Sequence, residues 1–318
     1  MPEGAHDFVP LDPLKFRDPL TTAKGEMRAS VALHALETLW FNTGSLCNIT
    51  CGHCYMNSSP SNDDLLYLSR DHVRAYLDEI ASEGLTVAEI GFTGGEPFMN
   101  RDLAGMLDDV LERGFRALVL TNAMKPLWQK RQELLSLKER HDTARLKLRV
   151  SIDHHSIAGH EQERGAGTWA PMERGVKWLL QHGFSIDVAG RTMWAETQDD
   201  ARQGYQHLFD AWGLGLDAND PSRLVLFPEM DDSRDVPEIT TQCWSILNVR
   251  PDAMMCARSR MVVHRKGTAA PTVVPCTLLP YDPRFDMGRR LVDAGGAVPL
   301  NHPHCAKFCV LGGASCSA

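Results

Sequence analysis

The chain has 318 residues, of which 43% are hydrophobic and 23% charged, and its formal net charge is -8. This length accommodates one large α/β barrel with an appendage, or two ordinary domains. The negative charge argues against a surface for nucleic-acid phosphates, which needs a basic patch. No window holds the roughly 18 to 20 apolar residues of a membrane helix, and residues 1–10 lack a secretory signal pattern. We therefore expect a cytoplasmic protein.

Residues 1–35 are predicted to be an N-terminal extension. Between residues 36 and 229, short apolar or β-branched runs alternate with amphipathic stretches, which is typical of βα units and a parallel sheet. The predicted strands are 37–42, 87–93, 116–121, 146–153, 185–193 and 224–229. The predicted helices are 69–83, 102–113, 126–141, 171–181 and 197–212. Because βα crossovers are right-handed, this series predicts a partial (βα)6 TIM-type barrel, three-quarters closed.

Unusual polar and reactive residues follow five of these strands at their carboxyl ends. They are the cysteine group that begins at Cys47, the run 94–97, Asn122, the run 153–155, and Arg191. In parallel α/β sheets, chemistry collects at the carboxyl ends of the strands. We therefore expect one functional site along this rim.

Residues 230–318 do not continue the βα pattern. They are rich in Pro, Gly and Cys, with short β-like pieces at 261–264 and 272–275 and no long amphipathic helix. Such a segment has too few periodic hydrophobic residues for a core of its own. It is predicted to be a small cysteine-rich domain stabilised by a bound group.

Clustered cysteines predict two bound metal groups, one in the C-terminal region and one on the loop that begins at Cys47. In a reducing compartment, the nine cysteines are not expected to form disulfides, and those that cluster are expected to bind metal. Cys47, Cys51 and Cys54 form a C-x3-C-x2-C loop, which can place three thiolates on a cubane cluster and leave its fourth iron open. The alternatives are a zinc knuckle, which His53 could complete, or three unrelated cysteines.

This loop after the first strand, with Gly94, Gly95, Glu96 and Pro97 after the second, resembles the radical S-adenosylmethionine (SAM) superfamily over residues 36–229. The resemblance implies a [4Fe–4S] cluster on Cys47, Cys51 and Cys54, with SAM at the open iron. It also implies that His53 packs near the adenine and that the run 94–97 grips the methionine amino group of SAM.

The remaining rim residues have weaker counterparts in that superfamily. Ser151 and Asp153 resemble its ribose-contacting region, and Asn122 occupies a turn where the superfamily often has Thr-Asn-Gly, although Ala123 replaces the glycine here. Arg191 is a candidate for the SAM carboxylate, which a guanidinium can hold bidentately. The alternative for Arg191 is a surface arginine at a strand end.

The C-terminal cysteines resemble the opening of a SPASM or twitch extension, which carries auxiliary iron–sulfur clusters. The resemblance rests on Cys256, Gly267 and Cys276, although their spacing departs from the usual one. Together with Cys305, Cys309 and Cys316, the cysteines suffice for one auxiliary [4Fe–4S] cluster, and which of the five is spare stays open. A structural zinc site and unliganded thiols are the alternatives. Cys243 is expected to be a buried small hydrophobe.

The resemblance implies an enzyme that cleaves SAM reductively to a 5′-deoxyadenosyl radical, which abstracts hydrogen from a substrate. A flavodoxin or ferredoxin is the expected reductant. SPASM-like tails favour peptide maturation, yet no leader-binding region of about eighty residues precedes the predicted barrel, so a small-molecule or cofactor-biosynthetic substrate is the alternative. An iron–sulfur redox sensor would explain the cysteines but would leave the run 94–97 without a role.

Overall fold

The computed structural model describes residues 9–192, 196–228, 231 and 233–313. Its main feature is an eight-stranded sheet in the order β7-β6-β5-β4-β3-β2-β8-β9, in which only the β8–β9 pair is antiparallel. These strands are β2 (Thr38–Asn42), β3 (Glu89–Thr93), β4 (Arg116–Thr121), β5 (Leu146–Ser151), β6 (Ser185–Arg191), β7 (Leu224–Phe227), β8 (Ser259–Val263) and β9 (Thr272–Val274). A separate pair joins β1 (Ser30–Val31) to β10 (Val298–Pro299).

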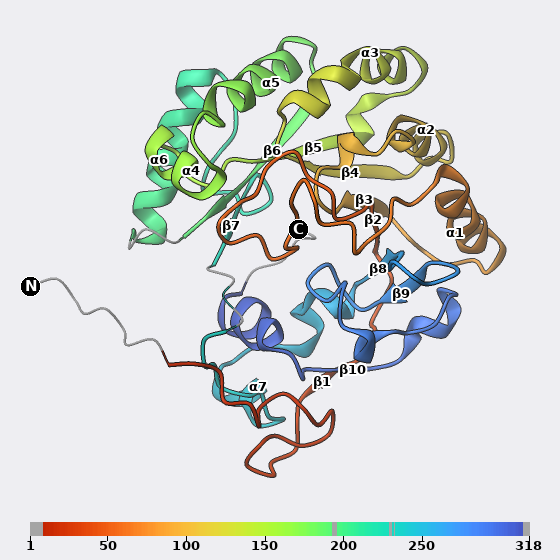
Figure 1. Cartoon of the computed structure of the whole chain (residues 1–318), viewed down its shortest axis with the longest axis vertical. Helices are drawn as coiled ribbons and strands as arrows, with labels where there is room; N and C mark the ends of the chain where they lie inside the picture. The colour runs from red at the N-terminus through yellow and green to blue at the C-terminus, as the bar shows by residue number, and fades with distance from the viewer. Residues whose placement is uncertain (1–8, 193–195, 229–230, 232, 314–318) are drawn as a thin grey trace, which may run out of the picture.

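Helices cover one side of this sheet. Figure 1 shows α1, α2, α3, α5 and α6 as an arc along it. The helices are α1 (Arg70–Ser82), α2 (Leu103–Glu112), α3 (Lys125–Arg140), α4 (Ile157–Arg164), α5 (Trp169–Gln181), α6 (Gln198–Trp212) and the short α7 (Cys243–Ile246). No helix within the described ranges is both long and apolar enough to cross a membrane.

The predicted α/β fold with a mostly parallel sheet is confirmed, and its six predicted strands correspond to β2 through β7. The tail of the fifth predicted strand, at Met193, and that of the sixth, at Glu229, lie outside the described residues. The structure adds α4, which the sequence pattern did not predict. It also places β8 beside β2, so the cysteine-rich region contributes two strands to the same sheet.

Strand β2 separates two hydrophobic cores because its side chains alternate between the two faces of the sheet. Leu39 and Phe41 face the helices and join the larger core. Trp40, between them, is fully buried in a second core on the other face. Gly91 on neighbouring β3 makes room for the indole, since a Cβ there would collide with the Trp40 ring.

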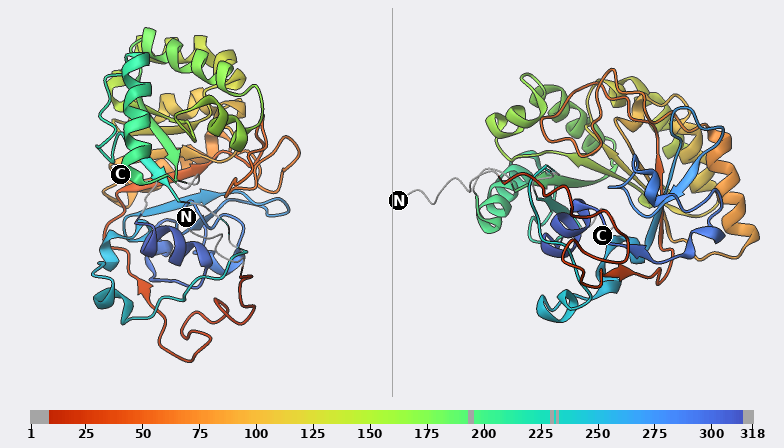
Figure 2. Two further views of the ribbon diagram at one scale, coloured as in Figure 1. Left: turned by 90° about the vertical axis from the view of Figure 1, so that its left-hand side faces the viewer. Right: turned by 60° about the horizontal axis from the view of Figure 1, so that its bottom comes forward.

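The second core is completed by the N-terminal extension. Phe16, Ala29 and Val31 pack in it with residues of the C-terminal region, and the Ala29 N–H donates to the Ile239 carbonyl at 2.9 Å. Figure 2 shows the N-terminal segment beside the C-terminal region, on the side of the sheet away from the helical arc. The region after residue 230 therefore shares its core with the extension and with one face of the sheet.

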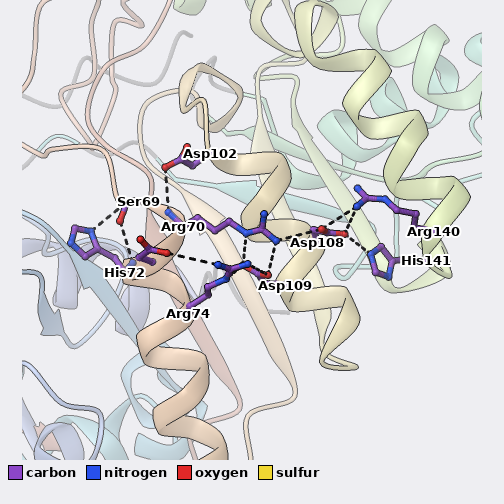
Figure 3. Close-up of polar contacts among 10 residues, drawn as sticks. Ser69, Arg70, His72, Arg74, Asp102, Asp108, Asp109, Arg140 and His141 are labelled. Carbon is purple, nitrogen blue, oxygen red and sulfur yellow. Dashed lines mark hydrogen bonds and ion pairs between the residues drawn. The ribbon is translucent and has the colours of Figure 1, made fainter.

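Charged side chains fasten the first helices together, as Figure 3 shows. Asp109 on α2 accepts hydrogen bonds from Arg70 at 2.7 Å and from Arg74 at 2.8 Å, both on α1. Its neighbour Asp108 contacts the His141 ring at 2.7 Å, just after α3. Burial raises the pKa of Asp109, but the two arginine hydrogen bonds outweigh burial and hold it below its usual value.

The predicted start of α1 is confirmed in detail. The Ser69 hydroxyl accepts the His72 N–H at 3.2 Å, and the His72 ring accepts the Ser69 N–H at 3.3 Å. This reciprocal capping satisfies two backbone donors that the first helical turn leaves open.

Candidate functional site

Cys47, Cys51 and Cys54 lie together on one cavity at the carboxyl ends of the parallel strands. The cavity contains about 790 Å³ of empty space, which includes space open to solvent. Strand ends and adjoining loops supply the polar part of its wall: Gly94, Gly95, Asn122, Ser151, Asp153 and Arg191. The residues predicted at the carboxyl ends of the strands therefore line one cavity.

The donor set of this cavity suits a cluster with an open iron. Among the described residues that line it, there is no fourth cysteine and no histidine. Burial raises the pKa of Cys47 to about 12 and that of Cys51 to about 11, so these thiols are protonated until a metal displaces their protons. Thiolates are the usual ligands of iron–sulfur clusters, and three of them leave one iron of a cubane free.

Helix α4 holds the cysteine loop in place. The Gly52 N–H donates to the Glu163 carbonyl at 2.8 Å, and the His53 N–H donates to the Glu163 carboxylate at 2.7 Å. The His53 ring also contacts this carboxylate, at 2.8 Å, and does not line the cavity. His53 therefore links the loop to α4.

The run after β3 shapes the cavity in two ways. A Cβ on Gly94 or Gly95 would collide with the backbone of the segment 44–46, which leads into the cysteine loop. Gly94 also has a φ of +131°, which favours glycine. Both glycines therefore bring their own backbone close to the cysteine loop and to the cavity. Pro97 is buried and begins the 3-10 turn Pro97–Met99.

Glu96 lies behind the cavity wall rather than in it. Its carboxylate accepts hydrogen bonds from the Thr121 hydroxyl and the Asn122 N–H, both at 2.8 Å. The residue is 1% exposed, and burial raises its pKa to about 7. Glu96 thus fixes the end of β4, a role that the sequence did not predict.

The turn after β4 has a left-handed backbone conformation at Ala123, the position where the related motif has glycine. Ala123 has a φ of +56°, which costs an L-residue roughly 1–2 kcal/mol. The Asn122 amide donates to the Asn48 side chain at 2.9 Å and accepts the Met124 N–H at 3.0 Å. Asn122 therefore connects this turn to the residue after Cys47.

Two arginines and one aspartate form the charged side of the cavity. Arg164, at the end of α4, contacts the Asp153 carboxylate at 2.8 Å. Arg191 lies 3.5 Å from the same carboxylate. Burial opposes ionisation of Asp153, but the two guanidinium groups lower its pKa and keep it charged. Arg191 is 7% exposed, and its Nη1 has no hydrogen-bond partner among the described residues.

Arg164 is a charged cavity residue that the sequence did not predict, because it belongs to the helix that was not predicted. A signal was present. The Ser156 hydroxyl caps α4 by accepting the Gly159 N–H at 3.2 Å, and Gly165 follows the helix with a φ of +98°. A serine and a glycine at this spacing are typical of the two ends of a short helix.

His154 and His155 form a polar pair beside the site and do not line the cavity. Their rings stack at 4.1 Å, and their Nε2 atoms contact Glu196 at 3.3 Å and 3.0 Å. The His154 Nδ1 accepts the Ser156 N–H, so a neutral His154 ring carries its proton on Nε2, facing the carboxylate. The Glu196 carboxylate therefore contacts both histidine rings.

Four of the C-terminal cysteines line a second cavity, whose empty space of about 350 Å³ includes space open to solvent. Cys256 comes from the 3-10 turn Met255–Ala257, Cys276 follows β9, and Cys305 and Cys309 lie on the π-helix Cys305–Leu311. Its other lining residues are mainly apolar, and burial raises the pKa of Cys256 to about 11. Four sulfurs in one apolar cavity suit a metal centre enclosed by protein.

Cys243 and Cys316 are the two cysteines that neither cavity accounts for among the described residues. Cys316 lies outside the described residues. Cys243 is partly buried against the second core, accepts the Thr240 N–H at 3.4 Å, and lines neither cavity.

Comparisons with known proteins agree with this geometry. The subtilosin biosynthesis protein AlbA of Bacillus subtilis is 29% identical over 187 residues, which cover 57% of this chain and 39% of AlbA. The Fe-coproporphyrin III synthase of Methanosarcina barkeri is 36% identical over 85 residues, or 26% of this chain and 20% of that protein. The chain thus spans well under half the length of these curated relatives.

The fold is also that of a solved enzyme structure. Streptococcus suis SuiB bound to precursor peptide SuiA superposes with a TM-score of 0.58 at 10% identity, covering 83% of this chain and 66% of SuiB. The family model described as the radical SAM superfamily matches residues 41–201, just over half of the chain. The chain therefore belongs to the radical SAM superfamily.

Proposed function

We propose that this SAM-dependent enzyme binds a [4Fe–4S] cluster through Cys47, Cys51 and Cys54 and holds SAM in the same cavity. The observation that carries this proposal is the set of three cysteines in a cavity whose described lining residues include no fourth cysteine. Held by these three cysteines, such a cluster would supply the electron for the reductive cleavage of SAM when it is reduced. The residues of the chain orient SAM and exclude water.

The charges around the cavity suggest how SAM is oriented. Arg191 lies 3.5 Å from Asp153 and has an unpartnered Nη1, whereas Arg164 donates a hydrogen bond to the Asp153 carboxylate at 3.2 Å. We therefore assign the methionine carboxylate of SAM to Arg191. The backbone of Gly94 and Gly95 borders the space for the amino group, which can donate to nearby carbonyl oxygens.

The ribose hydroxyls of SAM are assigned to the part of the wall beside Arg191, where Asp153 lies 3.5 Å from its guanidinium. Ser151, at the end of β5, and Asp153, just beyond it, both line the cavity. The Asp153 carboxylate is kept ionised by two guanidinium groups, and an ionised carboxylate is a strong acceptor for hydroxyl donors.

We also propose one auxiliary [4Fe–4S] cluster on Cys256, Cys276, Cys305 and Cys309. These cysteines come from three segments far apart in sequence and line one apolar cavity. Four thiolates complete the ligand set of a cubane, so this centre would have no open iron. Under this assignment Cys316 is the surplus cysteine.

For the substrate, we propose a ribosomally made peptide. The support is the similarity to AlbA, a bacteriocin biosynthesis protein, over more than half of the chain. A small molecule in cofactor biosynthesis is the second candidate, because Fe-coproporphyrin III synthase also matches, over 85 residues.

The two-cluster proposal is tested by iron content. After anaerobic reconstitution, the wild-type chain should hold about eight irons and Cys276→Ser about four to five, since each cubane holds four. Cys243→Ser is the matched control, because Cys243 lines neither cavity. A wild-type content of about four irons would remove the auxiliary cluster from the proposal.

The SAM chemistry is tested by product formation. With dithionite, or with NADPH, flavodoxin reductase and flavodoxin, the reconstituted protein should convert SAM to 5′-deoxyadenosine, measured by mass spectrometry. Cys51→Ala should form none. Full activity in that variant would contradict the assignment of the first cavity.

The substrate class is tested with a deuterated peptide. A short peptide encoded beside the gene, labelled with deuterium at its side chains, should transfer deuterium to 5′-deoxyadenosine. Transfer from coproporphyrin but from no such peptide would favour the small-molecule alternative.

A further inference from the structure

Arg260 on β8 is a completely buried cation beside the four-cysteine cavity. Its guanidinium donates to three backbone carbonyls at short range: Ala294 at 2.7 Å, Cys256 at 2.6 Å and Ser259 at 2.8 Å. A longer hydrogen bond reaches the Gly296 carbonyl at 3.3 Å. The side chain thus extends from β8 to the turn that carries Cys256.

Arg260 differs from Arg28 and Arg164, two other largely buried arginines, because no described carboxylate forms an ion pair with it. Arg28 is paired with Glu238 at 2.5 Å, and Arg164 with Asp153 at 2.8 Å. Burying a charge without a counter-charge is costly, since carbonyl dipoles replace only part of the lost hydration. A neighbouring negative charge would therefore stabilise the buried guanidinium of Arg260.

Negative charge on the cysteine sulfurs would provide this stabilisation. Arg260 binds the backbone carbonyl of Cys256 at 2.6 Å, and Cys256 lines the four-cysteine cavity. A cubane with four cysteinate ligands is an anion, and reduction adds a further negative charge to it. Net charge and burial are two of the factors that set the potential of such clusters.

We propose that Arg260 is the counter-charge of the auxiliary cluster and raises its reduction potential by stabilising the more negative, reduced form. This inference rests on the proposed auxiliary cluster in the second cavity. The carbonyl hydrogen bonds hold the guanidinium in place, and the charge acts through space on the cluster. Arg260 is a positioning and tuning residue that touches no substrate.

The test is the midpoint potential of the auxiliary cluster in the full chain, followed by EPR during a redox titration. The three cysteines of the first cavity are replaced by alanine in every sample, so that the auxiliary cluster gives the signal. Arg260→Gln should lower the midpoint potential of the cluster by about 59 mV for one electron. At a fixed applied potential, the ratio of reduced to oxidised cluster should then fall on the order of tenfold. Arg260→Lys, which keeps the charge, should stay close to wild type.

The control is Arg258→Gln. This arginine lies two residues before Arg260, but its side chain is 44% exposed and paired with Glu37. Its replacement should leave the potential unchanged, since solvent screens an exposed charge.

Each outcome decides the inference. It is supported if Arg260→Gln lowers the potential, or if that variant alone loses the auxiliary cluster while its circular dichroism is retained. It is overturned if Arg260→Gln keeps both the cluster and the wild-type potential. It is also overturned if the Gln and Lys variants lose the cluster or shift equally, because the hydrogen bonds would then matter rather than the charge. If the wild-type protein holds only about four irons, the proposed auxiliary cluster itself is contradicted. The proposed role of Arg260 is then overturned as well.

Discussion

The carboxylate of Glu163 holds His53 at two points, accepting the backbone N–H at 2.7 Å and contacting the ring Nδ1 at 2.8 Å. His53 lies between Cys51 and Cys54, and the Glu163 side chain is only 3% exposed. A helix that follows β5 therefore fixes the conformation of a loop that follows β2.

Glu163→Gln should weaken this link, because the amide is a poorer acceptor than the carboxylate. Hydrogen bonds to a charged group are worth about 1.5–3 kcal/mol, so we expect roughly tenfold faster loss of the first cluster to a chelator. The measurement is the decay of the iron–sulfur absorbance under anaerobic conditions. Glu161→Gln is the matched control on the same helix, because Glu161 accepts the Trp169 N–H instead. Equal decay in both variants would contradict the role of Glu163.

Arg191→Gln should weaken SAM binding about tenfold to a hundredfold, since it removes a charge-assisted hydrogen bond worth about 1.5–3 kcal/mol. Equilibrium dialysis with labelled SAM measures the effect. Arg223→Gln is the control, because Arg223 precedes β7 and is paired with Asp187 at 2.8 Å. Unchanged affinity in the Arg191 variant would assign the SAM carboxylate to another group.

His160 should make the fold less stable as the pH falls. The ring is fully buried with its edge on Trp169, and burial lowers its pKa to about 4, against about 6.5 in the unfolded chain. Because the unfolded chain takes up the proton first, the stabilisation is present above pH 6.5 and is lost as the pH falls toward 4. Between pH 7 and pH 5 the loss should be about 2 kcal/mol.

Urea unfolding at several pH values checks this effect. His160→Phe should flatten the pH dependence, because it keeps an aromatic ring at this position and removes the titrating group. His207→Gln replaces an exposed histidine on α6 and should leave the slope unchanged. A wild-type slope in the His160 variant would refute the assignment.

Asp109→Asn should lower the free energy of unfolding by about 1.5–3 kcal/mol, since Arg70 and Arg74 would lose their shared carboxylate (Figure 3). Urea unfolding at pH 7 measures the loss. Asp71→Asn is the control, because the Asp71 side chain is 91% exposed and lies 3.8 Å from Arg74, a geometry worth little. A similar loss in both variants would show that the effect is not specific to the α1–α2 contact.

Local sequence features determined much of this protein. The spacing of Cys47, Cys51 and Cys54 and the start of the helix at Ser69 each depend on residues close together in the chain, so their patterns could be interpreted directly. The family and the α/β fold followed from these patterns. Helix α4 was also locally encoded, by Ser156 and Gly165, but it is short and its apolar periodicity is weak.

The tertiary structure decided what depends on contacts between distant segments. It turned Glu96 toward the end of β4, placed Arg164 on the cavity, and brought the N-terminal extension into the second core. It also joined β8 to β2 and gathered Cys256, Cys276, Cys305 and Cys309 around one cavity. No local pattern specifies such contacts, because they depend on how the whole sheet and both cores pack. The sequence alone thus determined the kind of chemistry, and packing decided which side chains surround it.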